Sequence, residues 1–150
     1  MVKKSDIYLF AVILYAAFIF YLSSISHPPS PSYGLMMQVY NFLKSIGLGF
    51  IAYPFYLYTL FPDKFLHFFL YLGFGLILNP AVRNYKTNEM NSVSISIIIG
   101  GVYAASDEIH QMFVPYRSAT FSDFFVDLMG IIAAQMLILA FNRIIRSMKR

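Results

Sequence analysis

The chain has no cysteine and few charged residues among its 150 residues. Without cysteine it has no disulfide framework, and no thiolate can serve as a nucleophile or a metal ligand. Charged residues make up 12% of the sequence, whereas soluble domains carry roughly 25%. A water-soluble globular domain is therefore not the class that this composition indicates.

Apolar and aromatic residues take the place of the missing charges. The sequence is 59% hydrophobic, with a mean hydropathy of +0.64. A soluble core of this length does not need so much apolar surface, so the composition predicts a polytopic membrane protein. The net charge is +4, but the basic residues lie between and beyond the apolar runs. That distribution indicates membrane topology rather than binding of nucleic acid.

Four apolar runs are long enough to cross a bilayer as helices, which takes about 20 residues each. We predict an all-α, four-helix membrane bundle that forms a single domain over 1–150. The expected spans lie at about 7–25, 63–82, 93–113 and 122–141. A cleaved signal peptide is the alternative for the first run, but its apolar stretch exceeds the usual ~7–15 residues, which favours an uncleaved anchor.

An extra helix is expected between the first two spans. A proline-rich break at 27–34 ends the first span, because prolines cannot continue a helix. From Met36 to Ile46 apolar residues then recur at helical spacing, which is typical of an amphipathic helix in the membrane interface. A short helix packed on its neighbours fits equally well. The aromatic stretch 47–61 suits the headgroup region, and Pro54 makes an independent span unexpected.

The basic residues predict the orientation in the membrane. With four spans, both chain ends and the loop at 79–92 share one side. That side holds Lys3, Lys4, Arg83, Lys86, Arg143, Arg146, Lys149 and Arg150. The other side keeps Lys44, Lys64 and Arg117. The positive-inside rule therefore predicts that both termini are cytoplasmic.

Most of the acidic residues fall at the opposite ends of the spans. The second and fourth spans begin there, and the third ends there, so residues four apart on each helix share a face. We expect these groups to meet in a shallow polar pocket near the outer boundary of the membrane. The candidate binding residues are Asp63, Lys64, His67, Asp107, Glu108, His110, Gln111, Arg117, Asp123 and Asp127.

Two blocks within this polar set resemble the signatures of the VanZ-like family. The first is Asp63-Lys64-x-x-His67-Phe68, with Tyr71 and Gly73 after it. The second is Glu108-x-x-Gln111-x-Phe113-x-Pro115-x-Arg117, followed by Ser122-Asp123 and Gly130. Ser23, Ser24 and Ser26 match a serine-rich exit from the first span, so the resemblance covers about 21–134.

The resemblance implies a multi-pass protein of the bacterial plasma membrane and a role in the cell envelope. The family is named for a determinant of resistance to glycopeptide antibiotics, teicoplanin above all, and the resemblance implies no particular reaction. The family typically has asparagine where this chain has Asp127, and glycine where it has Ala134. The first difference adds a charge to the predicted site.

Binding of an amphiphile is the first function that these residues suggest. Arg117 would hold a carboxylate or phosphate, and the acids would bind an ammonium or hydroxyl groups. Aromatic residues such as Phe113, Tyr116 and Phe121 would take an acyl chain. The expected partners are a membrane lipid, a lipid-linked envelope precursor or an acylated glycopeptide.

A membrane-embedded enzyme acting on a lipid-linked substrate is the alternative. His67 or His110 would act as general base or metal ligand, with Glu108 or Asp123 as its partner. Histidines and carboxylates can ligate zinc, but the spacing matches no H-E-x-x-H motif, and we predict no resident metal or cofactor. Ion pairs and helix caps offer a purely structural explanation, although four acids and one arginine would be a costly way to close a small bundle.

Overall fold

The protein is all-helical in the part that the computed structural model describes, residues 4–27, 31–85 and 87–149. Lys3, Lys86 and Arg150 from the charge count, and 28–30 of the proline-rich break, lie outside these ranges. The helices are α1 (Lys4–Ser23), α2 (Tyr33–Ser45), α3 (Gly49–Leu60), α4 (Pro62–Arg83), α5 (Glu89–Gln111) and α6 (Phe121–Met148).

Helices α1, α4, α5 and α6 are long and apolar enough to cross a membrane, so the predicted four-span architecture is confirmed. The largest difference in bounds is at α6, which runs seven residues beyond the predicted end at 141. Polar contacts support this extension, because Asn142 Nδ2 and Arg146 Nη2 each donate to the Glu89 carboxylate at 2.7 Å. The predicted polar turn from Asn79 is also shorter, since α4 continues to Arg83.

Side-chain caps fix where α5 and α6 begin. Asn88 accepts a hydrogen bond from the backbone N–H of Asn91 at 2.7 Å, and Thr120 accepts one from Asp123 at 3.2 Å. Both satisfy N–H groups that have no partner inside the helix. At the start of α4 no side-chain cap forms, and Asp63 lies instead in the first turn, where its charge suits the positive end of the helix dipole.

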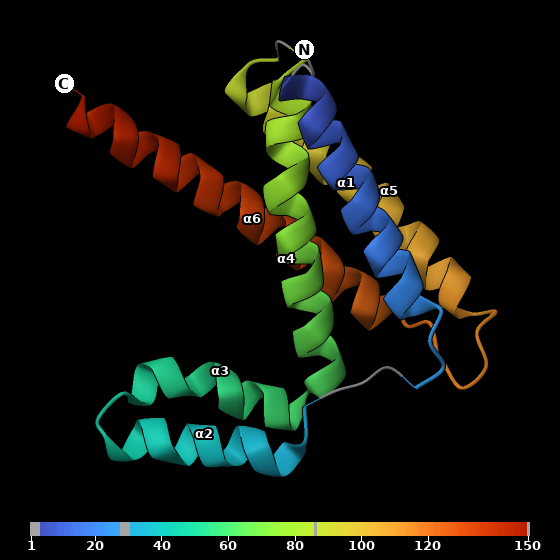
Figure 1. Ribbon diagram of the computed structural model, residues 1–150, viewed down its shortest axis with the longest axis vertical. Helices are drawn as coiled ribbons and strands as arrows, with labels where there is room; N and C mark the ends of the chain where they lie inside the picture. The colour runs from blue at the N-terminus through green and yellow to red at the C-terminus, as the bar shows by residue number, and fades with distance from the viewer. Residues whose placement is uncertain (1–3, 28–30, 86, 150) are drawn as a thin grey trace.

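Two helices, rather than one helix and an aromatic stretch, connect α1 to α4. Helices α2 and α3 run side by side at one end of the bundle (Figure 1), and Tyr40 and Tyr56 pack at 5.3 Å between ring centroids. Gly47, at φ 81°, makes the turn between them. Pro54 lies inside α3, where the loss of one N–H does not end the helix because the neighbouring hydrogen bonds persist. Helix α3 is not among the helices that could cross a membrane, in agreement with the prediction that this stretch is not an independent span.

Small residues bring α4 close to α6 at the centre of the bundle. A Cβ on Gly130 would meet the backbone of Phe68 and lie 2.9 Å from Leu72 N, and a Cβ on Gly75 would lie 2.7 Å from Ala134 Cβ. Small residues at these positions thus permit close helix contact. Beside them Asn79 Nδ2 donates to Gln135 Oε1 at 2.7 Å in the buried interior.

Helix α1 is part of the same bundle. Its Tyr15 hydroxyl donates to the Leu70 carbonyl at 3.0 Å, and the Tyr103 hydroxyl donates to the Ala16 carbonyl at 2.6 Å. The chain ends and the α4–α5 connection lie toward one end of the molecule, and the α5–α6 connection lies toward the other (Figure 1). This alternation places the first turn of α4, the last turn of α5 and the first turn of α6 together.

Candidate functional site

The predicted polar residues lie where three of the spanning helices meet. His67 is on the second turn of α4, Asp107 and Glu108 are on the last turns of α5, and Asp123 and Asp127 are on the first turns of α6. All five side chains are buried. Buried ionisable groups in such helices are costly unless they are paired or serve a function. The hydrogen-bond and ion-pair partners of each group therefore show which of them is left unsatisfied.

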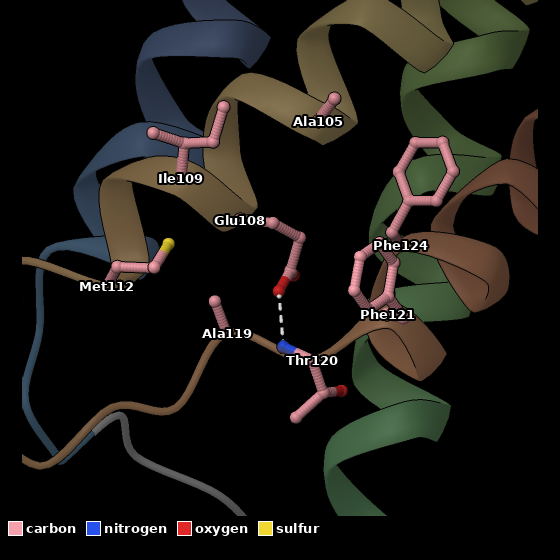
Figure 2. A pocket seen from close by; sticks show the side chains of 8 residues that line it. All are labelled: Ala105, Glu108, Ile109, Met112, Ala119, Thr120, Phe121 and Phe124. Carbon is pink, nitrogen blue, oxygen red and sulfur yellow. Dashed lines mark hydrogen bonds between the residues drawn. The ribbon is translucent and has the colours of Figure 1, made fainter.

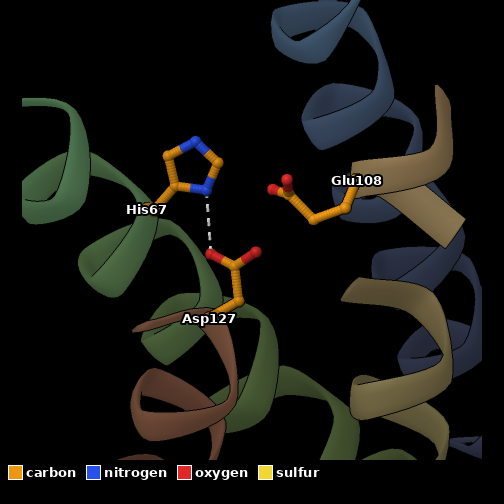
Figure 3. Close-up of side chains that lie close together, drawn as sticks. All are labelled: His67, Glu108 and Asp127. Atoms are coloured by element: carbon orange, nitrogen blue, oxygen red, sulfur yellow. Dashed lines mark hydrogen bonds and ion pairs between the residues drawn. The ribbon is translucent and has the colours of Figure 1, made fainter. Parts of the chain in front are cut away.

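Three of these residues form the centre of the site, which we call the central cluster: His67, Glu108 and Asp127. Nδ1 of His67 lies 2.9 Å from Oδ1 of Asp127. Figure 3 shows the Glu108 carboxylate pointing toward this pair from α5. One potential ligand atom from each of the three lies within 4.8 Å of the others, so the cluster could hold a metal ion.

An ion pair joins the first turns of α4 and α6. Lys64 Nζ donates to Asp123 Oδ1 at 2.7 Å and to Ser122 Oγ at 2.6 Å. The other oxygen of Asp123 accepts a hydrogen bond from the Thr120 hydroxyl at 2.6 Å. Both oxygens of Asp123 therefore already have partners, which makes this residue less suited to catalysis than the sequence suggested.

A chain of hydrogen bonds links the α5–α6 loop to the bundle interior. Arg117 Nη2 donates to Gln111 Oε1 at 3.0 Å, and Gln111 Nε2 donates to Asp107 Oδ2 at 3.2 Å. Asp107 Oδ2 also accepts from the Tyr71 hydroxyl at 3.2 Å. Arg117 follows Tyr116, whose φ of 63° is left-handed and uncommon for a bulky residue. The loop thus directs the arginine back toward the helices.

Two predicted residues lie apart from this buried group. His110 faces α1, with Nε2 3.0 Å from Ser24 Oγ and its ring stacked on Phe20 at 4.4 Å between centroids. Asp63 is at the exposed rim, 3.9 Å from His67 Nε2. Of the aromatic residues expected to hold an acyl chain, Phe113 and Tyr116 are largely exposed and line neither cavity described below.

Carboxylates exceed cations in the site. Asp63, Asp107, Glu108, Asp123 and Asp127 face Lys64, Arg117 and His67, so negative groups predominate even when His67 is counted as charged. Three buried carboxylate oxygens, one each from Asp107, Glu108 and Asp127, have no hydrogen-bond partner among the described residues. Because an unpaired buried acceptor costs free energy, the site has capacity for a cation or for ligand donors.

An apolar cavity of about 510 Å³ opens between α5 and the start of α6. Figure 2 shows Glu108 projecting into it and accepting a hydrogen bond from the Thr120 backbone N–H, at 3.0 Å. Ala105, Ile109, Met112, Ala119, Phe121 and Phe124 form the rest of the wall. The single carboxylate is therefore surrounded by hydrocarbon.

A second, more polar cavity of about 360 Å³ lies between α1, α4 and α5. Its polar residues are Ser23, Asp63, His67, Asp107, Gln111 and Arg117. Side chains of α1 and α4 form its apolar wall, among them Ile19, Leu66 and Leu70. His67 faces this cavity and Glu108 faces the apolar one, so the central cluster lies between the two.

Sequence reasoning missed some contributors to the site. Tyr71 donates a hydrogen bond to Asp107 but appeared in the sequence analysis only as part of the family motif. A tyrosine on an apolar helix is usually interpreted as a core residue. Thr120 donates its backbone N–H to Glu108, and no side-chain pattern in the sequence indicates a contact made by the main chain. Ser23, which is buried with no partner for Oγ among the described residues, was singled out only as part of a serine-rich exit.

Comparison with known proteins gives one clear result. The family model described as VanZ/LLP1 matches residues 8–142, which covers α4 and α5 in full, most of α1 and α6, and the whole polar site. No curated protein and no solved structure matches the chain. The motifs in α4, α5 and the α5–α6 loop, and the match over most of the sequence, show that the chain belongs to the VanZ/LLP1 family.

Proposed function

We propose that the protein binds an amphiphile with an anionic headgroup in the polar cavity. The observation that carries the proposal is the position of Arg117, a half-buried cation facing a cavity whose other wall is hydrocarbon from α1 and α4. Among the described residues Arg117 has a hydrogen bond to Gln111 and no ion pair. A guanidinium in that state is well suited to hold a carboxylate or phosphate in a bidentate manner.

The remaining polar groups of this cavity favour a headgroup that also carries hydrogen-bond donors. Asp63 and Asp107 line the same cavity, and Asp107 keeps one oxygen without a partner among the described residues. Hydroxyl or ammonium groups would satisfy these acceptors. A lipid-linked envelope precursor or an acylated glycopeptide has both features, and membership in the VanZ/LLP1 family supports this envelope role.

The orientation of the site belongs to the same proposal. The basic residues concentrate near the ends of α4 and α6 that lie away from the polar cavity, among them Arg83, Arg143 and Arg146. By the positive-inside rule that end is cytoplasmic, in the bacterial plasma membrane, and the polar cavity faces outward. An outward cavity would meet precursors and antibiotics on the side where they act.

Binding can be measured with purified protein in nanodiscs. The probe is a polyprenyl phosphate, compared with the polyprenol that lacks the phosphate, and complexes are detected by native mass spectrometry. We expect the phosphate to bind and Arg117→Gln to weaken its binding at least about tenfold, the range of one charge-assisted contact. Arg143→Gln, an exposed arginine at the other end of α6, is the matched control and should bind normally.

Equal binding of the phosphate and the alcohol, or equal loss in both variants, would refute an anion site at Arg117. A variant that elutes as an aggregate is replaced by Arg117→Lys, which keeps the charge and loses the bidentate geometry. That variant should lie between wild type and Arg117→Gln.

A second candidate function, a membrane-embedded enzyme, is favoured by the contact between His67 and Asp127. A histidine oriented by a carboxylate is a common general base. Under this alternative the wild-type protein converts the lipid-linked phosphate to a product that mass spectrometry detects. His67→Gln would stop product formation while the phosphate still binds. If the protein only binds the phosphate, the ligand stays chemically unchanged with both wild type and His67→Gln.

A further inference from the structure

We propose that the central cluster, His67, Glu108 and Asp127, is a binding site for a divalent transition-metal ion. The three side chains come from α4, α5 and α6, and their potential ligand atoms lie within 4.8 Å of one another. Figure 3 shows all three pointing into a common space. Imidazole and carboxylate are common ligands of such ions.

Burial and missing partners distinguish this cluster from a chance grouping of acids. Asp127 is fully buried, and Glu108 and His67 are each only 7% exposed. Glu108 Oε1 and Asp127 Oδ2 have no hydrogen-bond partner among the described residues. Two carboxylate oxygens in that state, facing one histidine, form a site in which a cation would relieve a large electrostatic cost.

The distances fit an ion that takes the place of a shared proton. His67 Nδ1 and Asp127 Oδ1 are 2.9 Å apart, and two ligands on a tetrahedral zinc ion lie ~3.3 Å apart, given bond lengths of ~2.0–2.1 Å. Glu108 would complete the triangle after a shift of roughly 1.5 Å or less, because the ligand atoms already lie within 4.8 Å of one another. The imidazole nitrogen favours Zn²⁺ or Mn²⁺ over Mg²⁺ and Ca²⁺, which prefer sites made of oxygen ligands.

Neighbouring groups hold the three side chains in place, as the groups that hydrogen-bond to metal ligands do at known metal sites. The Thr120 backbone N–H donates to Glu108 Oε2 at 3.0 Å, which leaves Oε1 for the ion. On the other side, His67 Nε2 lies 3.9 Å from the exposed Asp63 carboxylate, which can approach by side-chain rotation. A histidine placed between a metal and a carboxylate is fixed in one tautomer.

Three protein ligands would leave a coordination position for another molecule. Sites of this kind keep an open position for water or a ligand oxygen, whereas purely structural zinc sites have four protein ligands. The neighbouring spaces are the two cavities, because Glu108 lines the apolar cavity and His67 the polar one. The metal proposal does not depend on amphiphile binding and is tested separately from it.

Metal uptake can be measured on protein purified through a tag without histidine or cysteine. The native chain has no cysteine, so no thiolate contributes adventitious binding. The protein is stripped with a chelator, dialysed, and titrated with Zn²⁺, Mn²⁺, Mg²⁺ or Ca²⁺ in the absence of any added amphiphile. We expect one Zn²⁺ or Mn²⁺ per chain by elemental analysis, and a higher unfolding temperature when the ion is bound.

The variants are Glu108→Gln and Asp127→Asn, which keep side-chain size and remove a ligand charge. Each should weaken metal binding at least about tenfold, because the loss of a residue that only hydrogen-bonds to a metal ligand already costs about that much. His110→Gln is the matched control, because this histidine points toward α1 and away from the cluster. It should bind the metal as wild type does.

The proposal is overturned if the wild-type protein takes up no stoichiometric Zn²⁺ or Mn²⁺, whether or not any variant folds. It is also overturned if both cluster variants bind as tightly as wild type, or if His110→Gln alone abolishes uptake. Amphiphile binding is followed in chelator, so a failure of the metal site and a failure of the Arg117 site give different results.

Discussion

Lys64 is the residue that holds the first turn of α6 against α4. Its ammonium bonds to both Ser122 and Asp123, and Asp123 is buried. Lys64→Met would leave this carboxylate without its cation, so we expect a loss of about 1–2 kcal/mol in the free energy of unfolding, the cost of an unpaired buried acceptor. Unfolding in mixed micelles with increasing SDS measures it.

Lys44→Met is the comparison for that experiment. Lys44 is exposed on α2 and lies 5.6 Å from the Tyr40 ring centroid, where a cation contributes little. Similar stability of Lys64→Met and Lys44→Met would mean that the Lys64–Asp123 pair does not hold the helices together.

At this scale the sequence predicted which polar residues lie at neighbouring helix ends better than where each side chain points. Adjacent helical residues are turned by about 100°, so His110 faces Ser24 while Gln111 faces Asp107. Hydrophobic periodicity is weak on a helix that lipid surrounds, because lipid-facing and buried positions are both apolar. The directions of Asp63 and His110 therefore could not be predicted, although their positions at helix ends could.

Gly130 sets the distance between α4 and α6. A Cβ there would meet the backbone of Phe68 and Leu72, which cannot move aside as a flexible side chain can. Gly130→Ala should therefore destabilise the bundle by about 1–3 kcal/mol, the usual cost of overpacking. The same SDS titration measures the effect.

Gly101→Ala is the matched control for Gly130→Ala. A Cβ on Gly101 would lie 3.5 Å from Leu128 Cδ1, an ordinary contact, and alanine favours the helix by up to about 1 kcal/mol over glycine. We expect unchanged or slightly higher stability. A Gly130→Ala protein as stable as Gly101→Ala would show that the α4–α6 contact tolerates separation.

Elements were predictable to the extent that length and apolarity alone define them. Four long apolar runs can hardly be anything but spanning helices, and their positions agree with α1, α4, α5 and α6. The segment between α1 and α4 was predicted less well, because Pro54 and the short lengths of α2 and α3 gave no single pattern. Their packing on each other, as at Tyr40 and Tyr56, is a long-range contact that a local pattern does not contain.

The orientation of the whole molecule can be tested with single cysteines, since the native chain has none. Ser118 is exposed in the α5–α6 loop and Ser147 is exposed near the end of α6. With cytoplasmic termini, a membrane-impermeant maleimide should label Ser118→Cys in intact cells and Ser147→Cys only after permeabilisation. The reverse pattern would place the polar cavity on the cytoplasmic side.

Helix α6 has 28 residues, a length of roughly 42 Å at ~1.5 Å per residue, whereas the hydrocarbon core of a bilayer is ~30 Å thick. Such a helix either leans or projects into water, and the balance shifts with the lipids around it. Asp123 and Asp127 lie on its first two turns, where they contact Lys64 and His67 of α4 and approach Glu108 of α5. A change in hydrophobic mismatch that tilts α6 would therefore also move Asp123 and Asp127 relative to α4 and α5. We expect the geometry of the site to depend on the thickness of the membrane.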